Sequence, residues 1–582
     1  MKLSPSSKTQ KHTLAILTAL LVLGLSACAK PASDSPQSTS TAQPDAQPLA
    51  TSTLEIKTTP VPTQTTAPQE ASAQIDSGMI VFSMADGLYT HLFAYNPNNL
   101  APTRLTGYNW DDDDPAISPD GTQIAFSSNR EGQWEIYVLN LKTDSLLRVT
   151  NSKNYDGSPA WSPDGQYLIY QTMNGDHLDL IIQSIADPSS APIQLTSDAG
   201  NNFSPTWSPD GRTIAFITDR SGKNAIWLAD LQTPDDRFKI IASAEDEDYA
   251  HPAWSPDGSQ LAWCSKSPDQ SIRVIALSDP TSIRTVGVGC NPVWSPDGKT
   301  LLALFDQPNE QYLVGYDVSA GIINLPMMRF DQSIHSLDWK GAAASQTILN
   351  YLDLQSLPGQ EPLFSTQLTL PTSSTGRSGV VALEKVNVEN AYLADSSNES
   401  FAALRKALGQ RIGWDYLNTL DNAYLPLSAP ASPGIEPNWL FTGRAVAVNS
   451  VPMDANWLVV TREDYSGQTY WRLWLKCLDQ TGLCGEPIRA MIWDFSARYS
   501  SDTTAYENGG ALAKSPSGYW FDLTEYAHRF GWERLPAQSN WRSYLPGSLF
   551  NTFVYSESKT WQQAMLEIYP PEALEAAGYA IH

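Results

Sequence analysis

The stretch Trp161-Ser162-Pro163-Asp164-Gly165 decides the fold, because it recurs along the first half of the chain. The other copies are Trp207–Gly211, Trp254–Gly258 and Trp294–Gly298, preceded by the variant Ile117–Gly121. The serines of successive copies are 44, 46, 47 and 40 residues apart. A repeat of this period is typical of a propeller or another array of small units.

Each copy has the composition of a turn between two strands. Proline presets φ, Asp bonds to the backbone just after it, and Gly accepts the left-handed closing position. Strand-like runs flank every turn, such as 167–171 after the second copy, and further runs such as 135–141 and 147–150 complete each unit. Four short strands per unit indicate a propeller blade, in which the Trp or Ile before the turn packs between adjacent blades.

The pattern Trp-Ser-Pro-Asp-Gly followed by runs such as Thr213–Ile217 resembles the TolB-type, WD-like propeller repeats of bacterial envelope proteins, over about residues 79–340. The resemblance implies a fold more than a function, because one such fold carries many functions. An incomplete blade at 79–106 and a lone strand-like run at 333–339 would close the ring together. We therefore expect an all-β six-bladed β-propeller, or a seven-bladed one if residues 345–370 add strands, followed by a smaller α+β domain.

The N-terminus has the features of an exported lipoprotein. Basic residues precede an apolar run at 13–24, which is short for a membrane span. Leu25-Ser26-Ala27-Cys28 follows and resembles the lipobox of bacterial lipoproteins, in which the Cys carries the lipid. The alternative is an ordinary signal peptide with an incidental cysteine. We expect an extracytoplasmic protein that is anchored to a bacterial membrane through Cys28.

The rest of the chain divides into segments by composition. Residues 1–27 form the expected signal peptide, and residues 28–76, rich in Ser, Thr and Pro, form a disordered tether. The propeller takes residues 77–341, a turn-rich linker takes 342–378, and the α+β domain takes 379–582.

The formal charge of −25 argues against nucleic acid as a partner, since binding a phosphate backbone needs a basic surface. Export permits disulfides. Cys477 and Cys484 bracket a Gly-containing turn, which favours a hairpin disulfide, whereas pairing of Cys264 with Cys290 stays open. Neither pair has the spacing of zinc ligands.

Acidic residues precede several turn motifs at equivalent places, just before the innermost strand of a blade. They should therefore gather near one mouth of the central channel. One interpretation is a negatively charged docking face or a cation site, and the other is strand capping and solvated turns. The residues are Asp111, Asp112, Asp113, Asp114, Asp156, Asp246 and Asp248.

In the C-terminal domain, strands are expected at 380–383, 456–461 and 469–476, and helices at 397–408 and 523–530. The domain holds ten of the nineteen tryptophans, which either build a core or line a groove. Two stretches, 442–448 and 526–542, resemble zinc D-Ala-D-Ala carboxypeptidases of the VanY type. However, Leu440 and Ala447 stand where that family has its ligands His and Asp, and no His lies near Trp541.

We found no catalytic residues, no metal ligands and no cofactor motif in the sequence. The expected function is that of a non-enzymatic, membrane-anchored lipoprotein whose TolB-like propeller is a scaffold for binding an envelope protein or a cell-wall component. The rival is a hydrolase that acts on wall peptide or glycan through the C-terminal domain. A structural element of the surface layer is a third possibility.

Replacing Cys28 with Ala should release the protein from the membrane or stall its processing, because the thiol is the expected attachment point of the lipid. Membrane fractionation and immunoblotting measure both effects. A variant that stays membrane-bound at wild-type size would contradict the lipoprotein prediction.

Overall fold

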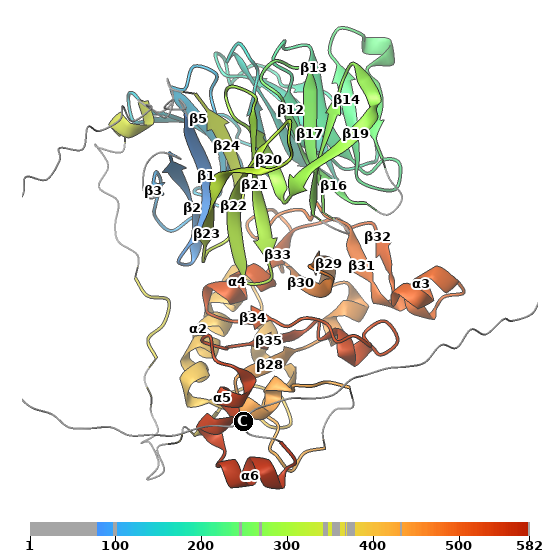
Figure 1. Cartoon of the computed structure of the whole chain (residues 1–582). Coiled ribbons are helices and arrows are strands. Elements are labelled where there is room, and N and C mark those ends of the chain that lie inside the picture. The colour runs from blue at the N-terminus through green and yellow to red at the C-terminus, as the bar shows by residue number, and fades with distance from the viewer. Residues whose placement is uncertain are drawn as a thin grey trace, which may run out of the picture. The chain divides into compact units, whose positions relative to one another are not determined.

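The computed structural model describes residues 78–96, 102–243, 247–266, 270–341, 347–351, 361–366, 368, 377, 379–430 and 434–579. Residues 73–582 form one compact unit (Figure 1). The expected signal peptide, Cys28, the tether and Asp246 lie outside the described residues.

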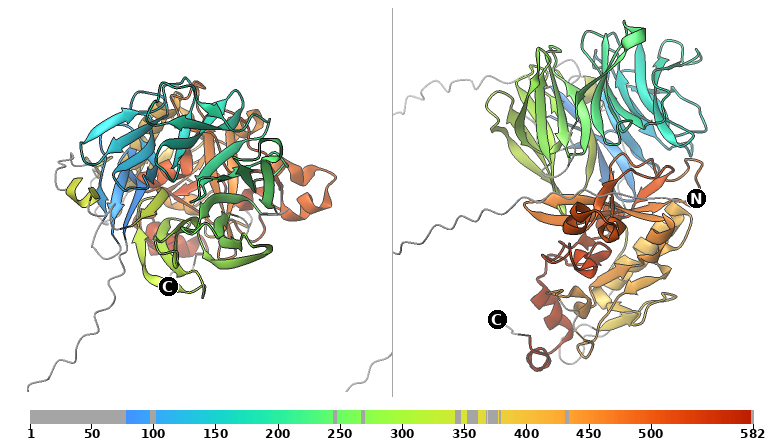
Figure 2. Two further views of the ribbon diagram at one scale, coloured as in Figure 1. Left: turned by 90° about the horizontal axis from the view of Figure 1, so that it is seen from above. Right: turned by 90° about the vertical axis from the view of Figure 1, so that its right-hand side faces the viewer.

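Six four-stranded antiparallel sheets form the propeller, and a smaller domain of helices and short strands follows. In Figure 2 the colour runs around the ring of blades from blue to green when the unit is viewed from above. This confirms the prediction of a propeller followed by a smaller α+β domain. Within the described part of 345–370, residues 347–351 are helical and no strand is present, so the ring has six blades.

The strands of the propeller are β1 (Met79–Asp86), β2 (Tyr89–Tyr95), β3 (Thr103–Arg104), β4 (Asp112–Ile117), β5 (Gln123–Ser128), β6 (Glu135–Asn140), β7 (Ser145–Arg148), β8 (Asp156–Trp161), β9 (Tyr167–Asn174), β10 (His177–Ser184), β11 (Ile193–Gln194), β12 (Asn202–Trp207), β13 (Thr213–Thr218), β14 (Ala225–Asp230), β15 (Phe238–Ala242), β16 (Tyr249–Trp254), β17 (Gln260–Ser265), β18 (Ser271–Ala276), β19 (Asp279–Val288), β20 (Cys290–Trp294), β21 (Thr300–Gln307), β22 (Glu310–Asp317), β23 (Ile323–Phe330) and β24 (Ile334–Lys340). A short 3-10 helix, η1 (Pro234–Asp236), precedes β15.

The first blade is built from both ends of the propeller sequence. Its order is β24-β1-β2-β3, and β24 pairs with β1 so that Ile80 faces Trp339 and Phe82 faces Leu337. The expected closing strand is therefore present. Closure matters because an open ring would leave a long unpaired strand edge.

The tryptophan before three of the turns, namely Trp161, Trp254 and Trp294, ties neighbouring blades together. The indole nitrogen of Trp161 donates to the carbonyl oxygen of Ala116 in the preceding blade at 2.9 Å, and that of Trp294 donates to Ala253 at 3.0 Å. The expectation that these residues pack between blades is confirmed. A disulfide between Cys264 on β17 and Cys290 on β20 covalently joins the same two blades that Trp294 and Ala253 link.

The turns themselves repeat one hydrogen-bond pattern. Asp164 accepts from the Ser162 hydroxyl at 2.6 Å and from the backbone N–H of Gln166 at 3.0 Å, and Gly165 closes the turn at φ +69°. A Cβ at Gly211 would lie 3.8 Å from Pro163 of the preceding blade, so successive turns lie against one another around the ring.

The C-terminal domain contains β25 (Val380–Ala382), β26 (Tyr392–Ala394), α2 (Asp395–Ile412), η2 (Tyr416–Asn418), β27 (Leu420–Asn422), η3 (Trp439–Thr442), β28 (Ala445–Val448), η4 (Val451–Ala455), β29 (Leu458–Tyr465), β30 (Gln468–Lys476), β31 (Ile492–Asp494), η5 (Phe495–Tyr499), α3 (Thr503–Asn508), β32 (Ala511–Ala513), β33 (Trp520–Asp522), α4 (Leu523–Arg529), β34 (Glu533–Arg534), η6 (Leu545–Ser548), β35 (Thr552–Val554), α5 (Trp561–Ile568) and α6 (Pro571–Ala576). Its larger sheets have the orders β27-β28-β35-β34 and β29-β30-β33.

Two element boundaries differ from the sequence-based expectation. Helix α2 begins at Asp395, because Ser397 lies inside its first turn with its hydroxyl donating to the carbonyl oxygen of Ala394. Strand β29 begins at Leu458 because Asn456 is left-handed, with φ +54°, at the end of η4. Many of the aromatic residues are buried core, including Trp471, Trp493, Trp520, Trp532 and Trp541.

Gly211→Val should lower the free energy of unfolding by about 1–2 kcal/mol, because a β-branched residue is strained at the φ of +72° found there. Asp210→Asn should cost less than about 1 kcal/mol, because the amide oxygen can still accept from Ser208 and from the N–H of Arg212. Chemical denaturation of both variants measures the difference. Equal losses would mean that the charge of Asp210 has a structural role of its own.

Candidate functional site

Each innermost strand that carries a turn motif bulges at the same place, and one polar residue occupies each bulge. In β8, for example, the pairing with β9 shifts between Gly157 and Ala160, and Ser158 lies at φ +51°. A positive φ is uncommon for residues other than Gly and often marks functional positions. The equivalent residues are Asp114, Ser158, Ser204, His251 and Asn291, and we call them the bulge ring.

Sequence reasoning identified only one member of the bulge ring, Asp114, although a signal for the others was present. Every member immediately precedes a proline, and that proline stands three residues before the serine of the turn motif. The repeat unit is thus longer than the turn motif, and its variable polar residue occupies the bulge.

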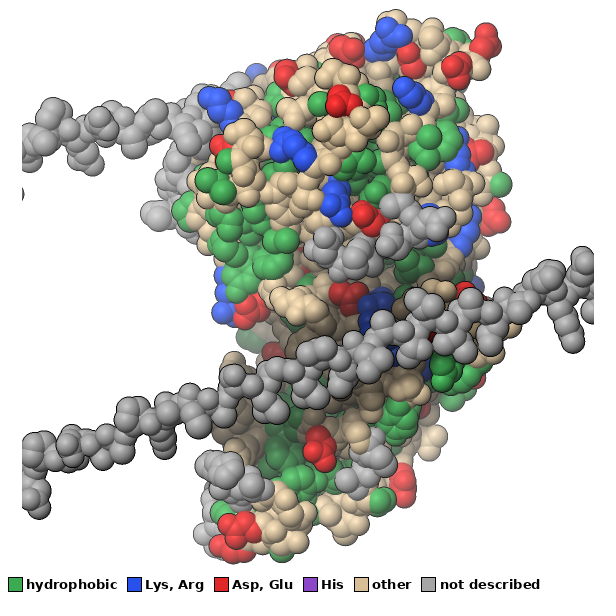
Figure 3. Space-filling model, turned by 45° about the vertical axis from the view of Figure 1, so that its right-hand side comes forward, with side chains coloured by type: hydrophobic (Ala, Val, Ile, Leu, Met, Phe, Trp, Pro, Cys, Tyr) green, Lys and Arg blue, Asp and Glu red, His purple; other side chains and the backbone are tan. Residues whose placement is uncertain are grey.

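A chamber of about 470 Å³ lies between the bulge-ring mouth of the propeller and the C-terminal domain. Four members of the bulge ring line it, namely Asp114, Ser204, His251 and Asn291. The C-terminal domain contributes charged side chains that include Glu463, Arg472, Glu486, Arg489, Glu525 and Arg529. Figure 3 shows basic and acidic side chains meeting in the hollow between the two parts.

Basic residues of the C-terminal domain bind the predicted acidic residues at this mouth. Arg411 from α2 pairs with Asp111. Arg489 donates to the Ser158 hydroxyl at 2.8 Å and lies 3.4 Å from the carboxylate of Asp114. Asp248 accepts from the backbone N–H of Met491 at 3.2 Å. The acidic mouth is thus a docking face for the chain's own C-terminal domain.

His335, on the closing strand β24, bridges the two parts between two carboxylates. Its Nδ1 lies 2.7 Å from Asp113 of the propeller, and its Nε2 lies 3.0 Å from Glu525 on α4. Burial alone would lower the pKa of His335, but Glu525 and Asp113 outweigh it and hold the pKa well above its ordinary value. The side chain of His335 therefore stays protonated at neutral pH and forms one ion pair with Asp113 and another with Glu525.

Two further predicted acidic residues that the structure describes do not line the chamber. Asp112 accepts from Ser128 at 2.6 Å and from Arg130 at 2.7 Å within its own blade. Asp156 accepts from the Ser152 hydroxyl at 3.0 Å, and burial raises its pKa to about 7.

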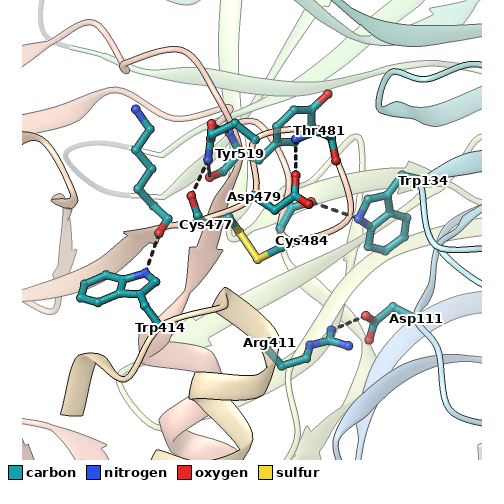
Figure 4. The surroundings of a disulfide bond; sticks show 12 residues. Asp111, Trp134, Arg411, Trp414, Cys477, Asp479, Thr481, Cys484 and Tyr519 are labelled. Carbon is teal, nitrogen blue, oxygen red and sulfur yellow. Dashed lines mark hydrogen bonds and ion pairs between the residues drawn. A yellow bond between two sulfur atoms is a disulfide. The ribbon is translucent and has the colours of Figure 1, made fainter. Parts of the chain in front are cut away.

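A disulfide between Cys477 and Cys484 fixes a C-terminal loop that rests on the propeller (Figure 4). The indole nitrogen of Trp134 donates to the carbonyl oxygen of Gly485 at 3.1 Å, and the amide of Gln133 donates to that of Thr481 at 2.9 Å. The disulfide therefore holds one wall of the interface in position.

A second pocket, of about 330 Å³, lies within the C-terminal domain. Both Leu440 and Ala447 line it, together with Trp439 and Phe550, so the two positions singled out from the sequence do lie in one pocket. Neither side chain can bind a metal ion. Among the described residues there is no group of three or more His, Cys, Asp or Glu placed to hold a metal. No described helix has the length and apolar character needed to cross a bilayer.

Comparison with known proteins assigns the propeller. Residues 76–202 and 189–325 match the family model of the TolB beta propeller domain. The propeller is of the TolB type. A relative, the Tol-Pal system protein TolB of Francisella tularensis subsp. holarctica, is 28% identical over 190 residues, which cover 32% of this chain and 40% of that protein. The chain thus spans well under two thirds of the length of this relative.

Two further comparisons also cover part of the chain. A protein TolB homolog of Chlorobium chlorochromatii is 34% identical over 145 residues, covering 25% of this chain and 31% of that protein. The crystal structure of TolB from Acinetobacter baumannii is similar with a TM-score of 0.41 and 18% identity, and the match covers 45% of this chain and 66% of that one.

His335→Gln should lower the free energy of unfolding at neutral pH by about 2 kcal/mol, because two charge-assisted contacts are lost, one within the propeller to Asp113 and one across the interface to Glu525. A raised folded-state pKa means that this stabilisation is complete below the ordinary histidine pKa and is lost as the pH rises through the raised value. The wild type should therefore lose stability on the alkaline side, and the variant should lose less there. Denaturation at several pH values tests this. His177→Gln, which removes contacts with Asp176 and Asp179 that both lie within the propeller, is the control. An unchanged alkaline profile in His335→Gln would contradict the bridge.

Proposed function

We propose that this protein is an extracytoplasmic, lipid-anchored binding scaffold rather than an enzyme, and that its TolB-type propeller binds an envelope protein or a cell-wall component. Cys28 would carry the lipid, and residues 28–76 would hold the folded unit away from the bilayer. The name of the Francisella relative places that protein in a Tol-Pal system, which supports a partner in the cell envelope.

The observation that carries the proposal is that the two mouths of the propeller are used differently. The bulge-ring mouth is covered by the C-terminal domain, whose arginines neutralise its carboxylates. The innermost strands run from that mouth to the turn motifs, so the turns lie at the other end, about 20 Å away for a strand of six residues. This second mouth is left for a partner.

The second mouth presents a ring of negative charge, which we call the turn ring. Each of its carboxylates is exposed and is held by the serine two residues before it. The Ser162 hydroxyl lowers the pKa of Asp164, and the Ser208 hydroxyl does the same for Asp210, which keeps both ionised. Such a surface favours a partner with a basic face. The members are Asp120, Asp164, Asp210, Asp257 and Asp297.

Crosslinking of the full chain in intact envelopes, followed by mass spectrometry, should recover one partner with crosslinks to the turn ring. Changing all five turn-ring aspartates to Asn should weaken its binding by about tenfold or more at low salt, because electrostatic attraction is lost. The matched control changes five exposed carboxylates of the C-terminal domain to amides: Glu384, Asp454, Glu507, Glu572 and Glu575. Equal binding by both sets would contradict the assignment of the turn ring, and the absence of any saturable envelope partner would contradict the scaffold.

A further inference from the structure

Two basic side chains in the chamber have no partner among the described residues. Lys266, just after β17, and His251, in the bulge ring, are both half-buried and line the chamber. No hydrogen bond or ion pair with a described residue engages either side chain. The nearby Arg489, in contrast, is fully used by Glu486, Asp114 and Ser158.

The electrostatics place these basic groups close together. Burial lowers the pKa of His251 well below its ordinary value, and the positive charges of Lys266 and Arg489 lower it further. Burial also lowers the pKa of Lys266, against the attraction of Asp248. An unpaired ammonium in such surroundings is costly unless water or a ligand solvates it. The Lys266 side of the chamber therefore attracts an anionic group.

The chamber also contains acceptors that are not satisfied. Asp306 on β21 accepts from the amide of Gln311 at 2.6 Å, but no described cation pairs with it. Burial raises its pKa. The side-chain oxygen of Gln270, which is buried, has no hydrogen-bond partner in the described structure. These two acceptors suit a donor, and above all an ammonium.

Most of the other charges that line the chamber neutralise one another. Arg472 pairs with Glu463 at 2.8 Å and with Asp522 at 2.7 Å. Arg534 also pairs with Glu463, and Arg529 pairs with Glu525 at 2.6 Å.

Lys266 has no ion pair in the described part of the chain, and two lining carboxylates, Asp248 and Asp306, have none either. Asp248 accepts from the amide of Asn224 at 2.6 Å and from the backbone N–H of Met491 at 3.2 Å, whereas the only described donor to Asp306 is the amide of Gln311. The described lining of the chamber therefore lacks a surplus of positive charge, which favours a ligand that carries one charge of each sign over a multiply charged anion.

We propose that the chamber binds a small zwitterion, an amino acid or a short peptide, with its carboxylate against Lys266 and His251 and its ammonium against Asp306. This ligand site goes beyond the proposed scaffold function, since it lies at the mouth opposite the turn ring.

The size and access of the chamber fit such a ligand. Its volume of about 470 Å³ lies within the range of small-molecule sites. Asp331, whose side chain is 80% exposed, belongs to its lining, so the chamber reaches solvent beside the connection between β23 and β24. A small molecule can therefore enter without separating the C-terminal domain from the propeller.

The test is isothermal titration of the full chain, purified in detergent, with the dipeptide alanyl-alanine and with free alanine. N-acetylalanine, which lacks the ammonium, and alanine amide, which lacks the carboxylate, are the matched probes. We expect at least one zwitterion to bind, and each blocked probe to bind about tenfold more weakly.

Lys266→Met and Asp306→Asn should each weaken zwitterion binding by about tenfold, because each removes one of the two charged contacts. The controls Lys142→Met and Asp454→Asn change exposed residues of the same types and should bind like the wild type. The melting temperature of Lys266→Met should not fall, because the variant loses an unpaired charge rather than a contact. A fall in both binding and melting temperature would indicate a structural role and would overturn the assignment of Lys266.

Two results would overturn the site as a whole. One is that neither zwitterion gives saturable binding up to millimolar concentration, which would leave water as the occupant of the chamber. The other is that the blocked probes bind as well as the zwitterions to the wild type, a result that does not depend on how the variants fold.

Discussion

The pairing of β24 with β1 is the constraint on which the rest of the molecule depends. It joins the two ends of the propeller sequence into one sheet, and the ring that results gives all six innermost strands a common axis. The same strand carries His335, which binds Asp113 on one side and Glu525 on the other. Strand β24 therefore both closes the ring and contributes to the docking of the C-terminal domain. The buried contacts at the interface are correctly placed only when the ring is shut.

Electrostatics explain how a chain with a formal charge of −25 forms this interface. Acidic residues brought to one mouth by the repeats would repel one another in the absence of counter-charges. The C-terminal domain supplies those charges through Arg411 and Arg489, and Arg529 adds a contact to Thr90. Guanidinium groups suit this role because they bind several acceptors at once and remain charged when buried. The second domain thus acts as an internal counterion for the first.

The blades could be predicted from the sequence because their signals are local. A Ser-Pro-Asp-Gly turn is stabilised within a few residues, as the contacts around Asp164 show, and its five copies narrowed the expected number of blades to six or seven. The interface could not be predicted in this way, because Arg489 and Asp114 are 375 residues apart and neither has a distinctive neighbourhood. The sequence did place Asp111 and Asp114 at a mouth, but it did not reveal what covers them. It also gave no indication that Lys266 and Asp306 face one space, since they lie in different blades.

The geometry of the bulge ring has a consequence for how such a protein can change over time. Each member is held at positive φ by the bulge and the proline after it, so the backbone fixes where its side chain points. The side chain itself is free to differ, and the five positions are in fact Asp, Ser, Ser, His and Asn. Single substitutions at the bulge-ring positions can therefore alter the chemistry of the channel while the blades stay intact. The backbone of the blades repeats, but the side chains that line the channel differ from blade to blade. Selection can therefore change them one position at a time.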